Sequence, residues 1–258
     1  MPTHSHLPSE IVDSIIDLLK GDTKALKECC LVSRSWVPRT RKYLFEEIGF
    51  WSRGKIDKWK RAFPVSAGSL AHYVRSLRID WGTPVDDEYE ENEKWIRSFT
   101  NLTKLRVIAL GGLRGNKPRL DAFHNLSPFI KSLHLYSTSL KKAFDLVYSF
   151  PLLEDLTIEG NWDTDGEEDG AVFQYSTSPA FSGTLKLGLG LKSVSHKLLD
   201  LRHDLHFRKI IWKVSSPLQL ESVKALLERC SATLEYIGIV FCQCSRSRPF
   251  GYRDGFSI

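Results

Sequence analysis

The hexapeptide LTKLRV at residues 102–107 shows the pattern on which the predicted fold depends. An apolar residue is followed by two other residues, a central apolar residue, one further residue and a last apolar residue. The same arrangement returns in IKSLHL at 130–135 and in LEDLTI at 153–158. Alternating apolar residues are typical of a strand with one buried face. The pattern therefore predicts a series of similar short strands.

The pattern occurs in eight places along the chain. Its central residues are Ile48, Leu77, Leu105, Leu133, Leu156, Leu185, Ile210 and Ile237, at separations of 23 to 29 residues. The flanking pattern positions are apolar in every copy except one, where Ser182 stands. A regular period of this length indicates stacked units, each of which contributes one strand to a shared core.

Helical patterns fill several of the intervals between these strands. Apolar faces are formed by Ile56, Trp59 and Phe63, by Leu140, Ala143, Phe144 and Val147, and by Val223, Leu226, Leu227 and Cys230. A capping box with proline at the first helical position, SPLQ at 216–219, precedes the last of these faces. Alternating strands and helices predict an α/β fold with a parallel sheet of about eight strand–helix units.

The repeat resembles a divergent leucine-rich repeat. The position five residues after each central residue is usually Asn or Cys in that motif, and only Asn161 and Cys242 comply here. We therefore expect an irregular leucine-rich-repeat-like solenoid over residues 45–258. Its last segment, RPFGYRDGFSI at 248–258, either forms a makeshift cap or belongs to a C-terminally shortened domain.

The first 44 residues predict three short helices. Ile11, Ile15, Leu18 and Leu19 form an apolar face on the first helix, and Val12 and Ile16 widen it. A unit this small does not bury so much apolar surface by itself. The wide face is interpreted as a partner-binding surface, and the alternative is that it packs wholly on the rest of the chain.

This N-terminal stretch resembles an F-box. The similarity is carried by Leu7-Pro8-x-Glu10, by the spaced apolar helix, and by LVSRSW at 31–36 followed by RTRKYLFEEI at 39–48. The SRSW form is similar to the version common in mushroom-forming fungi. The resemblance covers residues 6 to 48, and the connection between Leu19 and Leu31 is about two residues longer than the usual pattern.

The resemblance implies a small three-helix F-box over residues 1–44 that binds the Skp-family adaptor of a cullin-RING ubiquitin ligase. The implied contact residues are Leu7, Pro8, Ile11, Ile15 and Leu19, supported by Leu26, Val32 and Trp36. For Trp36 a purely structural place in the core of the three-helix unit is an equal alternative.

Basic residues lie between the inward-facing positions of the predicted strands. Alternation along a strand would place Arg78, Arg106, His134, Lys186, Lys104, Lys209 and Tyr136 on the concave face. Arg78 and Arg106 would stand side by side, and paired guanidinium groups suit a carboxylate or a phosphate. This face is a candidate receptor for an acidic or phosphorylated target protein, and its alternative is a solvated charged surface.

Composition and short motifs limit the classes of partner, the cellular compartment and the metal sites that the chain is expected to have. Charged residues make up 26% of the chain and the net charge is +5 without a long basic run, which argues against a nucleic-acid partner. No signal peptide or membrane-length apolar run is present, and the five cysteines indicate reduced thiols in the cytosol or nucleus. The acidic loops at 163–174 and 86–93, the pair Cys242 and Cys244, and the histidines at 196, 203 and 206 match no metal motif.

No nucleophile, phosphate-loop or cofactor motif is found, so we expect neither a catalytic residue nor a cofactor. The expected function is substrate recognition for a cullin-RING ligase of the SCF type. The F-box would hold the adaptor and the repeats would hold a target protein. The alternative is a protein-interaction scaffold that carries an F-box but has no ligase function.

Overall fold

The computed structural model describes residues 7–64, 70–80, 95–108, 123, 126, 128–136, 140–160, 179, 181–188, 192–199, 205–214 and 220–241. It shows an α/β protein in which eight parallel strands form one sheet in sequence order, β1 to β8. The strands are β1 (Glu47–Phe50), β2 (Ser76–Asp80), β3 (Lys104–Ile108), β4 (Ser132–Tyr136), β5 (Asp155–Glu159), β6 (Thr184–Leu187), β7 (Lys209–Val214) and β8 (Tyr236–Phe241).

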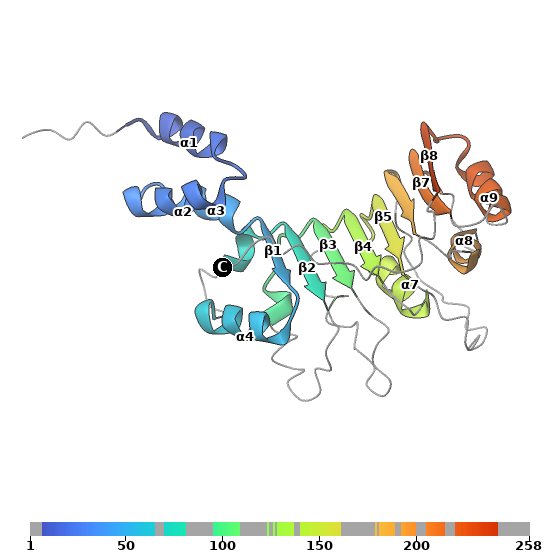
Figure 1. Cartoon of the computed structure of the whole chain (residues 1–258), viewed down its shortest axis with the longest axis horizontal. Helices are drawn as coiled ribbons and strands as arrows, with labels where there is room; N and C mark the ends of the chain where they lie inside the picture. The colour runs from blue at the N-terminus through green and yellow to red at the C-terminus, as the bar shows by residue number, and fades with distance from the viewer. Residues whose placement is uncertain are drawn as a thin grey trace, which may run out of the picture.

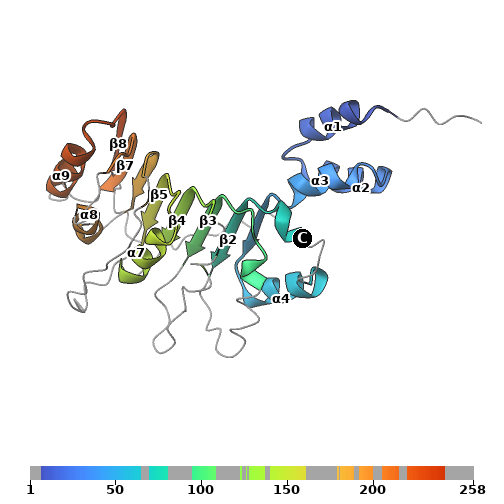
Figure 2. The ribbon, with the colours of Figure 1, turned by 180° about the vertical axis from the view of Figure 1, so that it is seen from behind.

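Helices cover one face of this sheet. The described helical segments after β1 are α4 (Arg53–Ala62), the 3-10 helix η1 (Leu70–Tyr73), α7 (Leu140–Tyr148), α8 (Lys192–Leu199) and α9 (Leu220–Cys230). Figures 1 and 2 show α4, α7, α8 and α9 on the same side of the row of strands. None of these described helices lies on the opposite side of the sheet, which we call the helix-free face.

The strand register confirms the eight parallel strands that the sequence pattern predicts. Each central residue pairs with the central residue of the next strand, from Ile48 opposite Leu77 to Ile210 opposite Ile237. The central residues and those two positions later are buried against the helices in β2 to β7. Fully burying one such side chain stabilises the fold by about 1.5–3 kcal/mol, so this double column forms the main core.

A backbone ladder repeats just before each strand. The carbonyl of Arg75 accepts hydrogen bonds from the amides of Thr103 and Lys104, both at 2.9 Å, and the carbonyl of Thr103 accepts from Lys131 and Ser132 in the next unit. Equivalent pairs of bonds recur before β5, β7 and β8. Before β6 the Gly183 amide donates to the Glu154 carbonyl, while the Thr184 amide donates to the Asp155 carboxylate at 2.6 Å. Because most units meet their neighbours with the same bonds, the strands stack without a change of register.

The sixth unit departs from the pattern. The expected flanking position, Ser182, is only partly buried, and Phe181 is 1% exposed and takes its place in the core. The Phe181 ring lies 5.1 Å from that of Phe207, and its backbone adopts a positive φ of 39°. This φ is uncommon for a residue other than glycine, and it turns the chain so that the aromatic ring faces inward.

The faces predicted for the helices are buried as expected. Trp59 in α4, Ala143, Phe144 and Val147 in α7, and Val223, Leu226 and Cys230 in α9 belong to the main core. Ile56, Phe63 and Leu227 pack against it. The predicted capping box at 216–219 lies outside the described residues.

Three helices precede the sheet: α1 (Ser9–Leu18), α2 (Thr23–Val32) and α3 (Val37–Leu44). Asp22 caps α2 by accepting a hydrogen bond from the amide of Ala25 at 3.0 Å, and Pro38 lies in the first turn of α3. The three helices enclose a separate small core at the β1 end of the sheet, with α1 farthest from the strands (Figures 1 and 2).

Candidate functional site

Helix α1 has two apolar stripes, and only one of them is buried. Val12 and Ile16 face inward and form the small core with Leu26. Leu7, Ile11, Ile15 and Leu18 face outward and are 56%, 49%, 37% and 86% exposed. Their spacing of four, four and three residues places them along one side of the helix. We call these four residues the outer stripe.

The residues that the F-box resemblance assigns to adaptor binding fall into two groups. Leu7, Pro8, Ile11, Ile15 and Val32 are exposed. Leu26 is buried in the small core, and Leu19 and Trp36 are partly buried against it. The position of Trp36 therefore agrees with the alternative in which it belongs to the core of the three-helix unit. Leu18 and Leu31 are also exposed; the first belongs to the apolar face noted in the sequence but not to the expected contact set.

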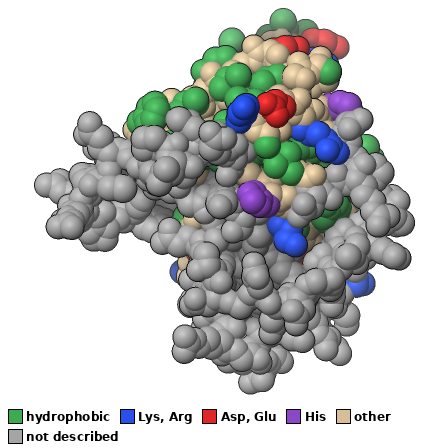
Figure 3. Space-filling view, turned by 90° about the vertical axis from the view of Figure 1, so that its right-hand side faces the viewer, with side chains coloured by type: hydrophobic (Ala, Val, Ile, Leu, Met, Phe, Trp, Pro, Cys, Tyr) green, Lys and Arg blue, Asp and Glu red, His purple; other side chains and the backbone are tan. Residues whose placement is uncertain are grey.

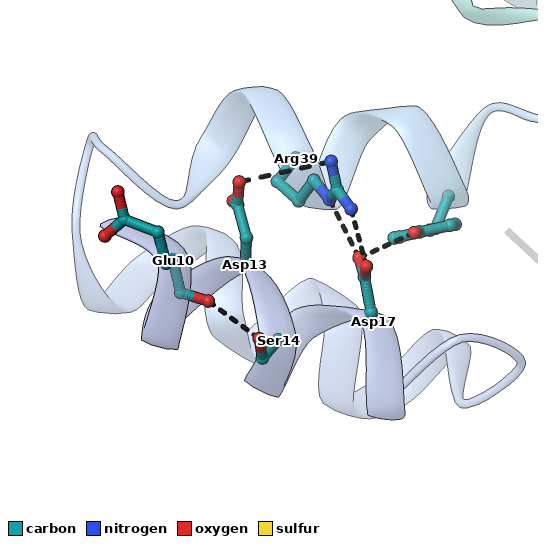
Figure 4. A network of polar contacts seen from close by, with 6 residues as sticks. Glu10, Asp13, Ser14, Asp17 and Arg39 are labelled. Atoms are coloured by element: carbon teal, nitrogen blue, oxygen red, sulfur yellow. Dashed lines mark hydrogen bonds and ion pairs between the residues drawn. The ribbon is translucent and has the colours of Figure 1, made fainter. Parts of the chain in front are cut away.

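A polar network joins α1 to α3 beside this surface (Figure 4). Asp17 accepts hydrogen bonds from Arg39 Nε at 2.8 Å and Nη2 at 2.5 Å, and from the Tyr43 hydroxyl at 2.6 Å. The Arg39 guanidinium and the Tyr43 hydroxyl lower the pKa of Asp17 to about 2. Asp13 is more distant, with its carboxylate 4.0 Å from Arg39. The network fixes α1 on α3 and so orients the outer stripe.

The helix-free face carries the second candidate surface. Arg78 of β2 lies opposite Arg106 of β3, and Arg106 lies opposite His134 of β4. Neighbouring strands are about 4.8 Å apart, so the three basic side chains stand in one row. The sequence pattern predicts this row, and the register confirms it.

Other basic residues of this face have partners of their own. His134 Nε2 lies 3.1 Å from Glu159 Oε2, and Lys213 Nζ donates to Glu159 Oε1 at 2.7 Å. Hydrogen bonds from His134 and Lys213 lower the pKa of Glu159 to about 2. Lys209 Nζ lies 4.5 Å from the ring centroid of Tyr236. Positive charge toward the β8 end is thus partly neutralised within the protein.

The remaining candidates of this face lie apart from these pairs. Lys104, Lys186 and Tyr136 are exposed on β3, β6 and β4. Glu159 and Lys213 lack any sequence signal for their pairing, because 54 positions separate them.

A third exposed surface lies on the last strand. Figure 3 looks onto this end of the molecule and shows hydrophobic side chains gathered there. The exposed apolar residues of β8 are Tyr236, Ile237, Ile239, Val240 and Phe241. Ile237 and Ile239 occupy positions whose equivalents are buried in β2 to β7.

Within the described ranges no group of three or more metal-ligating side chains is close enough to hold an ion. The acidic loops at 163–174 and 86–93, and Cys242, Cys244 and His203, lie outside those ranges. Burial raises the pKa of the Cys230 thiol, which disfavours a reactive thiolate there. Among the helices that the structure describes, none combines the length and apolar character that a bilayer crossing requires.

Comparison with protein-family models and with curated proteins finds no match for this chain.

Proposed function

We propose that this chain is an F-box protein that recognises target proteins for a cullin-RING ubiquitin ligase. In this function α1 to α3 bind the Skp-family adaptor, and the divergent leucine-rich-repeat-like sheet binds a target protein in the cytoplasm or nucleus. The protein performs no bond chemistry and acts by holding the target near a ubiquitin-loaded conjugating enzyme.

The observation that carries the proposal is the outer stripe of α1. Leu7, just before α1, and Ile11, Ile15 and Leu18 within it lie exposed beside a second stripe of the helix that is already packed. Exposed apolar surface of this kind marks an interaction site. An amphipathic helix that presents such a stripe suits a hydrophobic groove on a partner, and the F-box resemblance assigns Leu7, Ile11 and Ile15 to that contact.

The sheet supports the target-binding half of the proposal. Its helix-free face presents a row of side chains from successive strands at one register. Stacked units of this kind provide the extended surfaces that repeat proteins use to bind other proteins. The outer stripe lies at the β1 end, beyond the sheet (Figures 1 and 2), so adaptor and target have separate surfaces.

The test is capture of purified Skp-family adaptor by the chain, followed by addition of cullin. We expect the double variant Ile11→Asp/Ile15→Asp to lose adaptor binding, because burying a charge in an apolar interface costs on the order of several kcal/mol for each carboxylate. Leu152→Asp is the matched control, since Leu152 is an exposed apolar residue away from α1.

Undiminished capture by Ile11→Asp/Ile15→Asp would remove the basis of the assignment. Capture of adaptor without recruitment of cullin would instead favour the scaffold function. A circular-dichroism melting curve shows whether each variant keeps the folded sheet.

A further inference from the structure

We propose that Arg78 and Arg106 form a receptor for one phosphate group on a phosphorylated side chain of the target protein. This inference rests on the proposed function, because it specifies what the helix-free face recognises. It assigns the recognition to the β2–β3 part of that face and not to the whole row of basic residues.

The two arginines stand at one level of the sheet. Arg78 and Arg106 are register partners on adjacent parallel strands, about 4.8 Å apart along the hydrogen-bonding direction. Arginine presents forked donors that match the oxygens of a phosphate. Two adjacent like charges repel each other, so a dianion that contacts both relieves a repulsion that a single carboxylate would only half neutralise.

An aromatic wall borders Arg78 on the β1 side. Its guanidinium carbon lies 5.4 Å from the centroid of the Trp51 ring, and Gly49 is the register partner of Arg78. The Trp51 ring occupies the space that a side chain at Gly49 would fill. The missing side chain therefore lets the indole lie against Arg78, where it restricts the guanidinium and shields it from water.

Arg78 also has an unused donor. Its Nε atom is buried and makes no hydrogen bond within the described part of the chain. A buried donor without a partner is unfavourable, and an oxyanion placed between the two arginines would satisfy it. The acids Glu47 and Asp80 stand in the flanking columns of the same face, yet no ion pair joins either of them to Arg78 among the described residues.

The other end of the face is less suited to an anion. His134 and Lys213 already contact Glu159, and Lys209 lies over Tyr236. A ligand anion there would compete with a carboxylate that is part of the protein. Arg78, whose Nε makes no hydrogen bond among the described residues, therefore marks the better place for an anion.

The experiment uses the chain in complex with its adaptor and three immobilised libraries of short peptides. The libraries differ only in the fixed central residue, which is phosphoserine, aspartate or serine. We expect retention on the phosphoserine library and a loss of about tenfold or more in the variant Arg78→Glu/Arg106→Glu. Lys197→Glu/Lys224→Glu makes the same change in net charge at exposed lysines of α8 and α9, away from the helix-free face, and should keep most of the retention.

A second variant, Arg78→Lys/Arg106→Lys, keeps both charges but removes the forked donors, and an intermediate loss is expected. Equal retention on the phosphoserine and serine libraries would overturn the proposal. Equal retention on the aspartate library would overturn its phosphate specificity, and an equal loss in the lysine control would reduce it to a general charge effect. Adaptor recovered in each sample separates these results from a failure of the proposed function.

Discussion

Lys213 and Glu159 form an ion pair across an intervening strand. Lys213 Nζ of β7 lies 2.7 Å from Glu159 Oε1 of β5, although β6 runs between them. Gly188 directly follows β6 and has no side chain to block the contact, since an added Cβ would lie 3.0 Å from the Glu159 Cα. His134 of β4 reaches the other oxygen of the same carboxylate. One acid thus links three strands of the helix-free face.

This arrangement predicts a pH-dependent contribution of Glu159 to stability. Hydrogen bonds from His134 and Lys213 lower its pKa from 4.5 to about 2. Because the folded-state pKa is depressed, the contribution is present above pH 4.5 and is lost as the pH falls toward 2. We expect Glu159→Gln to cost about 1–2 kcal/mol at pH 7 and almost nothing at pH 2, discounted because the pair is partly exposed.

Urea denaturation of both proteins at several pH values, followed by tryptophan fluorescence, measures this difference. A gap between wild type and Glu159→Gln that stays constant from pH 7 to pH 2 would contradict it. Lys104→Gln, an exposed lysine on β3, serves as a control for loss of a surface charge on the same face.

The absence of a side chain at Gly188 predicts a steric effect. In Gly188→Ala the new Cβ would stand 3.0 Å from the Glu159 Cα and 3.2 Å from its Cγ. Because the nearest of these atoms is backbone, relief requires a strand shift, and we expect a cost of about 1–3 kcal/mol. Gly54→Ala in α4 is the matched control, since no atom lies within 4 Å of its added Cβ.

Alanine favours a helix over glycine by about 1 kcal/mol, so the control should be neutral or stabilising. Urea midpoints of the two variants provide the comparison. Equal destabilisation by both would mean that the space above Gly188 is not required.

The sequence pattern predicts the strands well because the apolar alternation reports burial directly. All eight central residues, from Ile48 to Ile237, are register neighbours in the sheet. The pattern does not predict that Phe181, and not Ser182, enters the core in the sixth unit. That arrangement depends on a positive φ at Phe181, which no neighbouring residue type indicates. The pattern does not predict the Glu159–Lys213 ion pair either, because the pair depends on the strand register and on the absence of a side chain at Gly188.

The outer stripe is only partly predictable. The sequence marks both sides of α1 as apolar, but it does not say which side packs inward. Contacts with α3 determine which side of α1 packs inward, since Arg39 and Tyr43 bind Asp17 and so set the rotation of α1. Ile11 and Ile15 then point outward while Val12 and Ile16 enter the small core.

Loss of the Asp17 contacts should loosen α1. We expect Asp17→Asn to speed hydrogen exchange of the α1 amides, because the bidentate contact with Arg39 is lost. Asp13→Asn is the matched control one turn earlier, where the carboxylate is 4.0 Å from the same arginine. Mass-spectrometric hydrogen exchange compares the two variants, and equally fast exchange in both would show that Asp17 has no special part in fixing α1.

The Asp17 carboxyl should also titrate in a characteristic range. The guanidinium of Arg39 holds its pKa at about 2, below the ordinary 3.8. With a depressed pKa the contact persists below pH 3.8 and is lost as the pH falls through about 2. In an NMR titration of the carboxyl carbon we expect a midpoint near 2, which returns toward 3.8 in Arg39→Ala. A midpoint near 3.8 in the wild type would contradict the bidentate contact.

The last strand allows a matched test of where the core ends. Ile210 of β7 and Ile237 of β8 are register partners of the same residue type, yet they are 0% and 48% exposed. Truncating a buried isoleucine to alanine costs about 2–5 kcal/mol, from lost transfer energy and the cavity that remains. We expect Ile210→Ala to fall in that range and Ile237→Ala to cost about 1 kcal/mol or less, because half of its side chain already meets water. Urea denaturation of the two variants in parallel gives the difference directly. Equal costs would mean that Ile237 is covered in solution, and the exposed apolar surface of β8 would then not be available to a partner.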